Sequence, residues 1–481
     1  MRRTKIVCTI GPATSSEDQL AALVNAGMNV ARLNFSHGEL EEHGAVIEKV
    51  RRVSERLGRS VAILQDLQGP KIRTGKLKGG QPISLVDGAP LTITTQDIEG
   101  SPGIVSTTYK ALPQDVKPGD CILLDDGLLE LRVADSNATE VHCIVVHGGL
   151  LKEHKGINLP GVAVSAAALT EKDRADLKFG IQHDVDYVAL SFVRRPEDIV
   201  EAKAYIKQLQ SELGRKQSEH VPLIAKLEKP EAIEHLEEIL RVTDGVMVAR
   251  GDLGVEMPLE KVPVIQKRII ARCNDLGLPV ITATQMLESM IINPRPTRAE
   301  TNDVANSILD GTDAVMLSAE TSVGAYPIET VQTMARIAVE TEANGQFLRR
   351  PHCSDLSHAH AVSHAARELS ELTSVEAIVV FTRTGASAHL ISKDRPRTPI
   401  LAYTPSERVY RLLALWWGVL PRQIALDGST EVLTNVVDQQ LQDDQLIPKG
   451  AYVVVMGGLP IASRARTNFV RLLCVGETLQ P

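Results

Sequence analysis

Short runs of β-branched and aliphatic residues alternate with helical patterns over most of residues 1–345. A helical segment follows each run except the third, and Thr170 and Thr297 begin two of these helices with the form of a capping box. Eight strands that alternate with helices predict a (β/α)8 TIM barrel closed by right-handed crossovers. The predicted strands are Lys5–Ile10, Val30–Phe35, Val61–Asp66, Tyr187–Phe192, Leu223–Leu227, Gly245–Ala249, Val280–Thr284 and Ala314–Ser318.

Two further patterns predict additional domains. Between about residues 70 and 158, short Val, Ile, Leu and Thr runs are separated by turns such as Asp87-Gly88 and Asp126-Gly127. This predicts a small all-β domain inserted after strand three, where it would cover the catalytic face as a lid. From about residue 361, a helix and four strands predict an open α/β domain at the C-terminus.

The expected domain bounds follow from these patterns. Residues 1–69 and 159–345 form the barrel, residues 70–158 the β insertion, and residues 346–481 the C-terminal α/β domain. In the last domain we expect a helix at His360–Leu372, and we place His358 and His360 near its start in a solvated linker. The strands predicted there are Ala377–Thr382, Ile400–Tyr403, Val419–Leu420 and Tyr452–Met456.

The composition is that of a globular protein without a nucleic-acid partner. The chain has 481 residues, 43% hydrophobic and 23% charged, enough for two or three cores. Its net charge is −8 and no long basic run occurs, which argues against nucleic acid. Six scattered cysteines without a CxxC pair favour reduced thiols. Because we find neither a signal peptide nor an apolar stretch of ~20 residues, we expect a soluble cytoplasmic protein without membrane association.

Two successive strands end in acidic residues. One predicted strand runs into Lys226 and Glu228, the next runs into Asp252, and a helix is predicted between them at Lys229–Leu240. In a parallel βα repeat these side chains meet at the carboxyl ends of neighbouring strands. Two carboxylates and an ammonium there indicate a divalent-metal site that handles an anionic substrate. A structural ion pair is the alternative.

Strands two and three carry a second polar group. Alternation places Arg32, Asn34 and Ser36 on one face, toward the barrel mouth. A buried arginine is costly unless it meets an anion, and its planar fork suits a phosphoryl group. The alternative is an arginine paired with a structural acid. Asp66, at the end of strand three, could share a cation with Asn34 and Ser36.

Three other positions carry candidate chemistry. Lys71 and Arg73 lie where the insertion leaves the barrel, so we expect them to meet a nucleotide phosphate rather than solvent alone. Gly251 lets the backbone approach a ligand, and a helix starting there would offer N–H groups to a carboxylate, although a tight turn also explains it. Thr284, at the end of strand seven, could relay a proton through water or could simply end the strand.

Together these segments closely resemble the pyruvate kinase family. The resemblance covers the whole chain, more weakly in the inserted and C-terminal domains. It is similar to that family's active-site motif at Val221–Ile233 and to further motifs at Asn34–Gly38, Gly69–Arg73, Met247–Gly254, Thr282–Met290, Pro296–Glu300 and Met316–Glu320.

The resemblance implies transfer of the phosphoryl group of phosphoenolpyruvate to ADP, which gives pyruvate and ATP in glycolysis. It implies that Glu228 and Asp252 hold Mg²⁺ (or Mn²⁺), with a second Mg²⁺ on the nucleotide. Such a transfer needs positioning and cations rather than covalent work by the protein. The implied catalytic residues are Lys226, Thr284 and Arg32. The same three residues, together with Gly251 and Asp252, are the implied substrate-binding residues. The implied nucleotide-binding residues are Arg73, Lys71, Asn34 and His37.

One departure concerns monovalent cations. Pyruvate kinases that need potassium carry Glu at the position of Lys71, and they carry a Thr-Lys pair where this chain has Leu67 and Gln68. The chain therefore resembles the bacterial, potassium-independent class. An ammonium at Lys71 could replace the monovalent cation, so we expect activity without K⁺. A monovalent site formed by Asn34, Ser36 and Asp66 stays open.

A second departure concerns regulation. Thr382, Arg383, Thr384, Gly385 and Ser387 resemble the family's effector phosphate loop, in which hydroxyls and N–H groups open a helix as an anion nest. A capped strand-to-helix turn is the alternative. Because Ala386 replaces a basic residue of the fructose-1,6-bisphosphate-activated class, and Arg464 and Arg466 enrich a later loop, we favour a sugar monophosphate or AMP as activator. The resemblance also implies a homotetramer.

Two other functions compete with the kinase. A phosphoenolpyruvate- or pyruvate-using aldolase or lyase would share the acid pair at the strand ends, but the inserted and C-terminal domains speak against it. A non-catalytic sugar-phosphate sensor would not need Lys226, Glu228, Asp252 and Thr284. An assay with phosphoenolpyruvate, ADP and Mg²⁺, with and without K⁺, separates the three.

Overall fold

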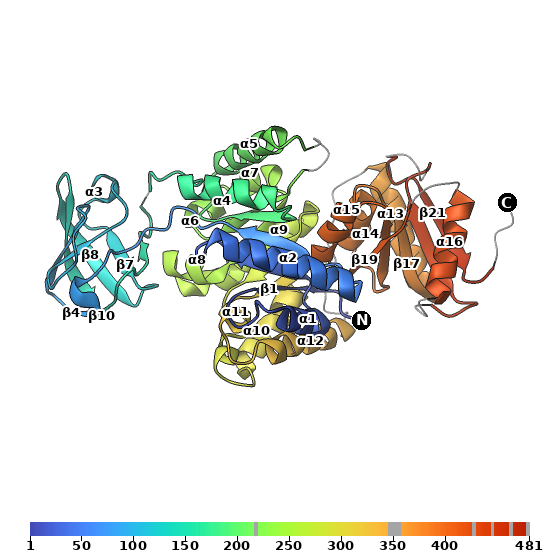
Figure 1. Cartoon of the computed structure of the whole chain (residues 1–481), viewed down its shortest axis with the longest axis horizontal. Coiled ribbons are helices and arrows are strands. Elements are labelled where there is room, and N and C mark those ends of the chain that lie inside the picture. Colours follow the sequence, from blue (N-terminus) through green and yellow to red (C-terminus); the bar gives the residue numbers. More distant parts are fainter. Residues whose placement is uncertain are drawn as a thin grey trace.

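The computed structural model describes residues 1–162, 164–215, 220–344, 357–425, 430–443, 447–460 and 465–477. The elongated molecule has three parts in a row (Figure 1). The β insertion lies at one end, the barrel in the middle and the C-terminal domain at the other end. Both extra domains therefore flank the barrel, on opposite sides of it.

The barrel has the eight parallel strands that the sequence predicts. Its strand order is β1-β16-β15-β14-β13-β12-β3-β2, and β16 closes it by pairing Ala314 with Lys5 of β1. Most strand residues are buried, as expected where helices cover the outer face of a parallel sheet. The bounds are β1 Lys5–Thr9, β2 Val30–Asn34, β3 Ala62–Asp66, β12 Tyr187–Leu190, β13 Leu223–Leu227, β14 Gly245–Ala249, β15 Val280–Ala283 and β16 Ala314–Leu317.

The barrel helices follow the predicted pattern, with one correction. Thr170 and Thr297 do form capping boxes, with Asp173 and Glu300 as their partners. The single helix predicted at Lys229–Leu240 is wrong, because the backbone leaves the helical region at His235 and starts a second helix. The bounds are α1 Glu17–Ala26, α2 Leu40–Leu57, α4 Glu171–Gln182, α5 Pro196–Glu212, α6 Pro230–Glu234, α7 Leu236–Val242, α8 Arg250–Glu256, α9 Val262–Asp275, α10 Arg298–Leu309, α11 Ala319–Ser322 and α12 Pro327–Ala343.

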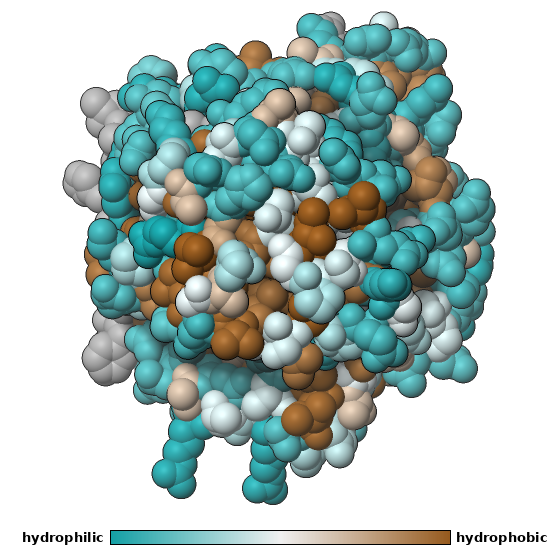
Figure 2. Space-filling view, turned by 90° about the vertical axis from the view of Figure 1, so that its left-hand side faces the viewer, coloured by the Kyte–Doolittle hydropathy of each residue, from teal (hydrophilic) through white to brown (hydrophobic). Residues whose placement is uncertain are grey.

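The insertion is an all-β body with its own apolar core. A six-stranded sheet has the order β11-β7-β8-β9-β5-β6, and β10 pairs with β4 in a second sheet. Figure 2 looks onto this end of the molecule, where apolar side chains gather near the centre of a hydrophilic face. Val86, Leu128 and Leu150 are the most exposed large apolar residues of the insertion. The bounds are β4 Ile83–Leu85, β5 Pro90–Thr94, β6 Ile104–Ser106, α3 Leu112–Asp115, β7 Cys121–Leu124, β8 Leu129–Ser136, β9 Glu140–His147, β10 Gly149–Leu151 and β11 Ile157–Asn158.

The C-terminal domain is an α/β sheet of order β19-β18-β17-β20-β21. The antiparallel edge strand β21 was not predicted. The linker predicted at His358 and His360 is wrong: Ser357 caps a helix that begins at His358, and His360 is buried. The bounds are α13 His358–Leu372, β17 Val375–Phe381, α14 Ala386–Lys393, β18 Ile400–Thr404, α15 Glu407–Leu412, β19 Val419–Gln423, α16 Thr430–Asp443, β20 Tyr452–Gly457 and β21 Phe469–Cys474.

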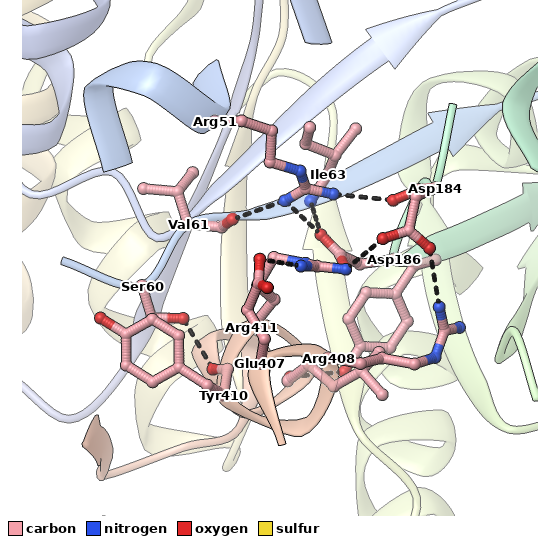
Figure 3. A network of polar contacts seen from close by, with 12 residues as sticks. Arg51, Ser60, Val61, Ile63, Asp184, Asp186, Glu407, Arg408, Tyr410 and Arg411 are labelled. Carbon is pink, nitrogen blue, oxygen red and sulfur yellow. Dashed lines mark hydrogen bonds and ion pairs between the residues drawn. The ribbon is translucent and has the colours of Figure 1, made fainter. Parts of the chain in front are cut away.

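Buried ion pairs join the C-terminal domain to the amino end of the barrel (Figure 3). Asp186 accepts from Arg51 at 2.9 Å and from Arg411 of α15 at 2.8 Å. A second anchor is Asp313, which pairs with Lys393 at 2.7 Å and with Arg395 at 2.9 Å. The two domains therefore share an interface held by buried charged side chains. Among the described residues, no helix is both long and apolar enough to cross a membrane.

Candidate active site

A buried ammonium joins three strand ends at the carboxyl end of the barrel. The Nζ atom of Lys226 on β13 lies 3.1 Å from Asp66 Oδ1 at the end of β3 and 2.9 Å from Glu228 Oε1. It also donates a hydrogen bond to Ser191 Oγ, just after β12, at 2.7 Å. Burial alone would lower the pKa of Lys226, but Asp66 and Glu228 outweigh it and raise the pKa. The ammonium therefore keeps its charge.

Arg32 lies on the other side of Asp66. Its Nε atom donates to Asp66 Oδ2 at 2.6 Å, and its Nη1 atom donates to the Thr9 hydroxyl at 2.9 Å. Burial would raise the pKa of Asp66, but Lys226 and Arg32 reverse this effect and lower it. Asp66 thus holds two cations in place side by side. The pairing expected as the alternative for Arg32 is present, and it fixes the guanidinium beside Lys226.

Glu228 is less well compensated than Asp66. It is 1% exposed, and its Oε2 atom accepts from the Phe192 amide at 2.7 Å. Burial raises the pKa of Glu228, the charge of Asp252 raises it further, and Lys226 opposes both. Two neighbouring carboxylates share one ammonium that also serves Asp66. This arrangement has room for further positive charge, which suits a divalent cation.

Thr284 and Gly251 are in direct contact. Thr284 Oγ1 accepts from the Gly251 amide at 2.7 Å and donates to the Ala283 carbonyl at 2.6 Å. Thr284 has a φ of 68°, which is costly for a β-branched residue and persists only where its surroundings enforce it. Gly251 is the second residue of the short helix α8, one of the two arrangements considered for it, and a Cβ there would meet the Thr284 hydroxyl at 3.3 Å.

Sequence reasoning missed the residues that hold Thr284. Arg250 donates through Nη2 to the Thr284 carbonyl at 2.8 Å, and through Nη1 to both carboxylate oxygens of Asp303 on α10. Ser191 was also missed, although it ends a predicted strand as the other site residues do. No sequence pattern pointed to Asp303, because only the packing of α10 brings this residue to the site.

Basic residues gather where the insertion meets the barrel. Burial lowers the pKa of His37, and the charges of Arg73, Lys71 and Arg32 lower it further, so these cations lie close by. Lys71 and Asp252 line one cleft between the barrel mouth and the insertion. The cleft is thus lined by both cationic and acidic side chains, which suits a nucleotide phosphate with its metal.

Comparison with known proteins agrees with this geometry. A family model described as the pyruvate kinase barrel domain matches residues 1–331, and one described as the pyruvate kinase alpha/beta domain matches residues 360–473. The chain belongs to the pyruvate kinase family. It is therefore a phosphotransferase, and its relatives support pyruvate kinase function.

Individual relatives match all or nearly all of this chain. Pyruvate kinase of Staphylococcus saprophyticus is 47% identical over 487 residues, which cover 100% of this chain and 81% of the relative. Pyruvate kinase of Staphylococcus aureus strain MRSA252 is 46% identical with the same coverage. A crystal structure of a pyruvate kinase from Cryptosporidium parvum has a TM-score of 0.90 at 36% identity, over 98% of this chain and 96% of that one.

Within this pyruvate kinase fold, the residues considered for a monovalent cation are already engaged. Asn34 Oδ1 accepts from the Ser36 amide at 3.2 Å, which closes a local turn. Asp66 is paired with Arg32 and Lys226. The three side chains lie at the ends of β2 and β3, where the register places Asn34 opposite Asp66.

The residues of the loop before α14 lie in two different environments, since some form hydrogen bonds within the C-terminal domain and others line a cavity. Thr382 Oγ1 accepts from the Gly385 amide at 2.9 Å, and Ser387 Oγ bonds Thr467 Oγ1 at 2.7 Å. Arg383 and Thr384 line a large cavity between the C-terminal domain and the amino end of the barrel. Of the arginines expected in the late loop, Arg464 lies outside the described residues.

Proposed function

We propose that the cluster around Lys226 transfers the phosphoryl group of phosphoenolpyruvate to ADP and so forms pyruvate and ATP. The observation that carries this proposal is the ammonium of Lys226, which Asp66, Glu228 and Ser191 fix at the barrel mouth. Phosphoryl transfer develops charge on the phosphoryl oxygens, and a preorganised cation stabilises that charge without reorganising during the reaction.

Arg32 would bind the substrate phosphate next to Lys226. Its guanidinium is oriented by Asp66 and Thr9, so the orientation of the fork is set before substrate arrives. Since Asp66 neutralises part of both charges, the two cations can lie close together. Positioning and charge of this kind are what a phosphotransferase must supply.

A divalent cation, Mg²⁺ or Mn²⁺, would be held by Glu228 and Asp252. The fit rests on their oxygen donors and on the excess of buried negative charge that raises the pKa of Glu228. When bound, the ion neutralises charge on the phosphoryl and enolate oxygens. Lys226 contacts Glu228, so the same ammonium positions this ligand and binds the substrate.

Thr284 would deliver the proton that converts the enolate into pyruvate, through a water molecule. Its hydroxyl already donates to one carbonyl and accepts from the Gly251 amide, so it sits in a defined orientation. We assign the Gly251 and Asp252 amides to the substrate carboxylate. The Gly251 amide must then exchange Thr284 for substrate, and the hydroxyl proton must turn from the Ala283 carbonyl toward the water molecule before it can be transferred.

The nucleotide phosphates would meet Lys71 and Arg73, with Asn34 and His37 beside them. This assignment rests on the cleft between barrel and insertion and on the cations that depress the pKa of His37. The insertion is tied to the barrel there through Asn158, whose amide donates to Glu256 at 2.9 Å. Movement of the insertion about this contact would open and close the nucleotide site.

A coupled assay tests the proposed function. The purified chain is mixed with phosphoenolpyruvate, ADP and Mg²⁺, and pyruvate and ATP are both measured. We expect equal amounts of the two products, and none when ADP or the divalent ion is left out. Pyruvate formed together with inorganic phosphate without ADP would indicate hydrolysis of phosphoenolpyruvate instead of transfer to ADP, and no pyruvate at all would overturn the proposal.

The ammonium of Lys71 would replace a monovalent cation, so we expect activity without K⁺. Rates are measured with K⁺ exchanged for an organic cation at constant ionic strength. The wild-type rate should change less than about twofold, whereas Lys71→Glu should lose most activity without K⁺ and regain it when K⁺ is added. A strict K⁺ requirement of the wild type contradicts this assignment.

The loop Thr382–Ser387 would bind the phosphate of an activator, either a sugar monophosphate or AMP. It opens α14, whose first N–H groups and the flanking hydroxyls make an anion nest. Candidate activators are compared by thermal shift and by their effect on the apparent KM for phosphoenolpyruvate. Ser387→Ala should abolish both responses, whereas Ser392→Ala on the same helix should not. Stabilisation by fructose-1,6-bisphosphate alone counts against this choice of ligand.

We also expect a homotetramer in the cytoplasm, as the resemblance to the family implies. Light scattering coupled to size-exclusion chromatography measures the mass in solution. A tetramer would have about four times the 52.2 kDa of one chain. A monomer that is fully active would contradict this expectation.

A further inference from the structure

Two histidines and an aspartate converge in the C-terminal domain, outside the active site. His360 and His364 lie one turn apart on α13, and their rings are 5.0 Å apart in an edge-to-face arrangement. Asp394 directly follows α14 and faces both rings. Among the residues that the structure describes, these three form the one group of three or more His, Cys, Asp or Glu side chains whose ligand atoms lie close enough together to hold a metal ion.

Two of the three distances between ligand atoms in this group match a tetrahedral metal site. Asp394 Oδ1 lies 3.4 Å from His360 Nε2 and 3.5 Å from His364 Nδ1. With metal–ligand bonds of about 2.0–2.1 Å, the edge between two ligands of a tetrahedron is about 3.3 Å. One ligand atom from each residue can be chosen so that all three lie within 4.8 Å of one another. A small closure of the two imidazoles completes the geometry.

A hydrogen bond to one of its oxygens orients the Asp394 carboxylate, as such bonds orient the ligands of metal sites. The Ser363 hydroxyl donates to Asp394 Oδ2, which leaves Oδ1 facing the two histidines. His360 and Asp394 are buried, whereas about half of the His364 side chain is exposed. His364 therefore marks an entry path from solvent, and a water molecule can take the fourth position.

The nearby lysine and arginine side chains pair with carboxylates other than that of Asp394. Lys393 and Arg395 flank Asp394 in the sequence, but both turn away to Asp313 of the barrel. Arg367, on the same helix as the histidines, pairs with Glu371 at 3.2 Å. Asp394 therefore faces the two imidazoles, which are placed to share a bound cation with it.

We propose that His360, His364 and Asp394 bind a divalent transition-metal ion of the Zn²⁺ class. Two imidazoles and one carboxylate select Zn²⁺, Co²⁺ or Ni²⁺ over Mg²⁺, which prefers oxygen ligands alone. The site is thus chemically separate from the one at Glu228 and Asp252. It joins the start of α13 to the end of α14, the helix that the loop Thr382–Ser387 opens. Bound metal would therefore stabilise the regulatory part of the molecule.

Binding of Co²⁺ to the full-length chain tests the site. After treatment with a chelator, the protein is titrated with Co²⁺ and the visible absorption of tetrahedral Co²⁺ is recorded, with calorimetry for stoichiometry. With excess Mg²⁺ present to occupy the site at Glu228 and Asp252, we expect one Co²⁺ per chain, which Zn²⁺ displaces. His364→Ala should weaken binding at least about 100-fold, because it removes one of three ligands. His358→Ala, which removes an exposed imidazole of the same helix, should bind as the wild type does.

The outcomes decide between a metal site and a protonated ion pair. His364→Gln provides a second variant, and circular dichroism together with pyruvate kinase activity shows that each variant is folded. If wild type and both His364 variants bind Co²⁺ equally, or if the wild type shows no tetrahedral absorption, the proposal is overturned. In that event the three side chains form a structural His–Asp ion pair.

Discussion

At the amino end of the barrel, Asp186 accepts from Arg51, from Arg411 and from the Ile63 amide, so each of its oxygens has a partner. At the carboxyl end, Glu228 has one cation, Lys226, which it shares with Asp66. Both clusters are buried beside strands of the same sheet. They differ in how completely their negative charge is compensated.

The pKa shifts express this difference. Burial tends to raise the pKa of a carboxyl in either place. At the amino end, Arg411 and Arg215 overcome burial and lower the pKa of Asp184. At the carboxyl end, burial and Asp252 prevail over Lys226, and the pKa of Glu228 is raised. A buried carboxylate that is short of positive charge costs stability, and a site that binds a metal and an anion gains from that shortage.

The largest difference in kcat is expected between two variants that each lack one lysine, either at the carboxyl end or at the amino end of the barrel. Lys226→Met should lower kcat by about 10³-fold or more, because it deletes the cation that we propose to face the moving phosphoryl group. Lys393→Met deletes an equally buried lysine from the interdomain anchor at Asp313. It should leave kcat nearly unchanged and lower the melting temperature. Steady-state kinetics and calorimetry measure both. Equal losses of kcat in the two variants would remove the distinction between the ends.

The second test removes an acid from the amino end. Asp186→Asn leaves Arg51 and Arg411 without their shared carboxylate, so we expect the variant to be destabilised by about 3 kcal/mol. The melting temperature should fall, while kcat at a temperature where the variant is folded should stay within about twofold. Glu228→Gln is the matched change at the other end, and it should raise the Mg²⁺ concentration needed for activity. A loss of activity in Asp186→Asn without a loss of stability would contradict the structural role.

The barrel and the acid pair could be predicted because both depend on short-range patterns. Eight apolar runs give the strands, and parallel strands bring Lys226, Glu228 and Asp252 to the same end. The partner of Arg32 was not predicted, since it depends on the register that sets β2 against β3. Asp303 reaches Arg250 only through the packing of α10, for which no local pattern exists.

The C-terminal domain was predicted less well for the same reason. His360 looked solvated because it follows a polar stretch, yet α13 packs it against Asp394, some thirty residues later in the chain. The strand β21 pairs antiparallel with β20 across a loop, which sequence alternation alone did not reveal. The break at His235 lies within a pattern that suits one continuous helix. In each case tertiary contacts overrode the local preference.

A smaller effect on kcat is expected from two variants that distinguish the role of the Thr284 hydroxyl from the role of its β-branched shape. Thr284→Val keeps the β-branch but cannot bond the Gly251 amide or transfer a proton, so kcat should fall by about 10²-fold. Thr284→Ser keeps the hydroxyl and relieves the crowding of a β-branched residue at a φ of 68°, so it should retain most activity. Rates with phosphoenolpyruvate and ADP are compared at saturation. A fully active Val variant would exclude Thr284 from the proton path.

The smallest effect concerns acid stability at the amino end. Asp184 pairs with Arg215, Arg408 and Arg411, and these arginines lower its folded-state pKa although burial opposes them. A lowered pKa contributes stability above the unfolded value of about 3.9 and loses it as the pH falls through the folded value. The difference in melting temperature between wild type and Asp184→Asn should therefore be constant from about pH 5 to 7 and shrink below about pH 4. Because 44% of the Asp184 side chain is exposed, the difference should be small and should decrease in high salt. A difference that does not change down to about pH 3 would mean that the charge of Asp184 contributes nothing to stability, and that the ion pairs of Asp186 and Asp313 hold the amino end without it.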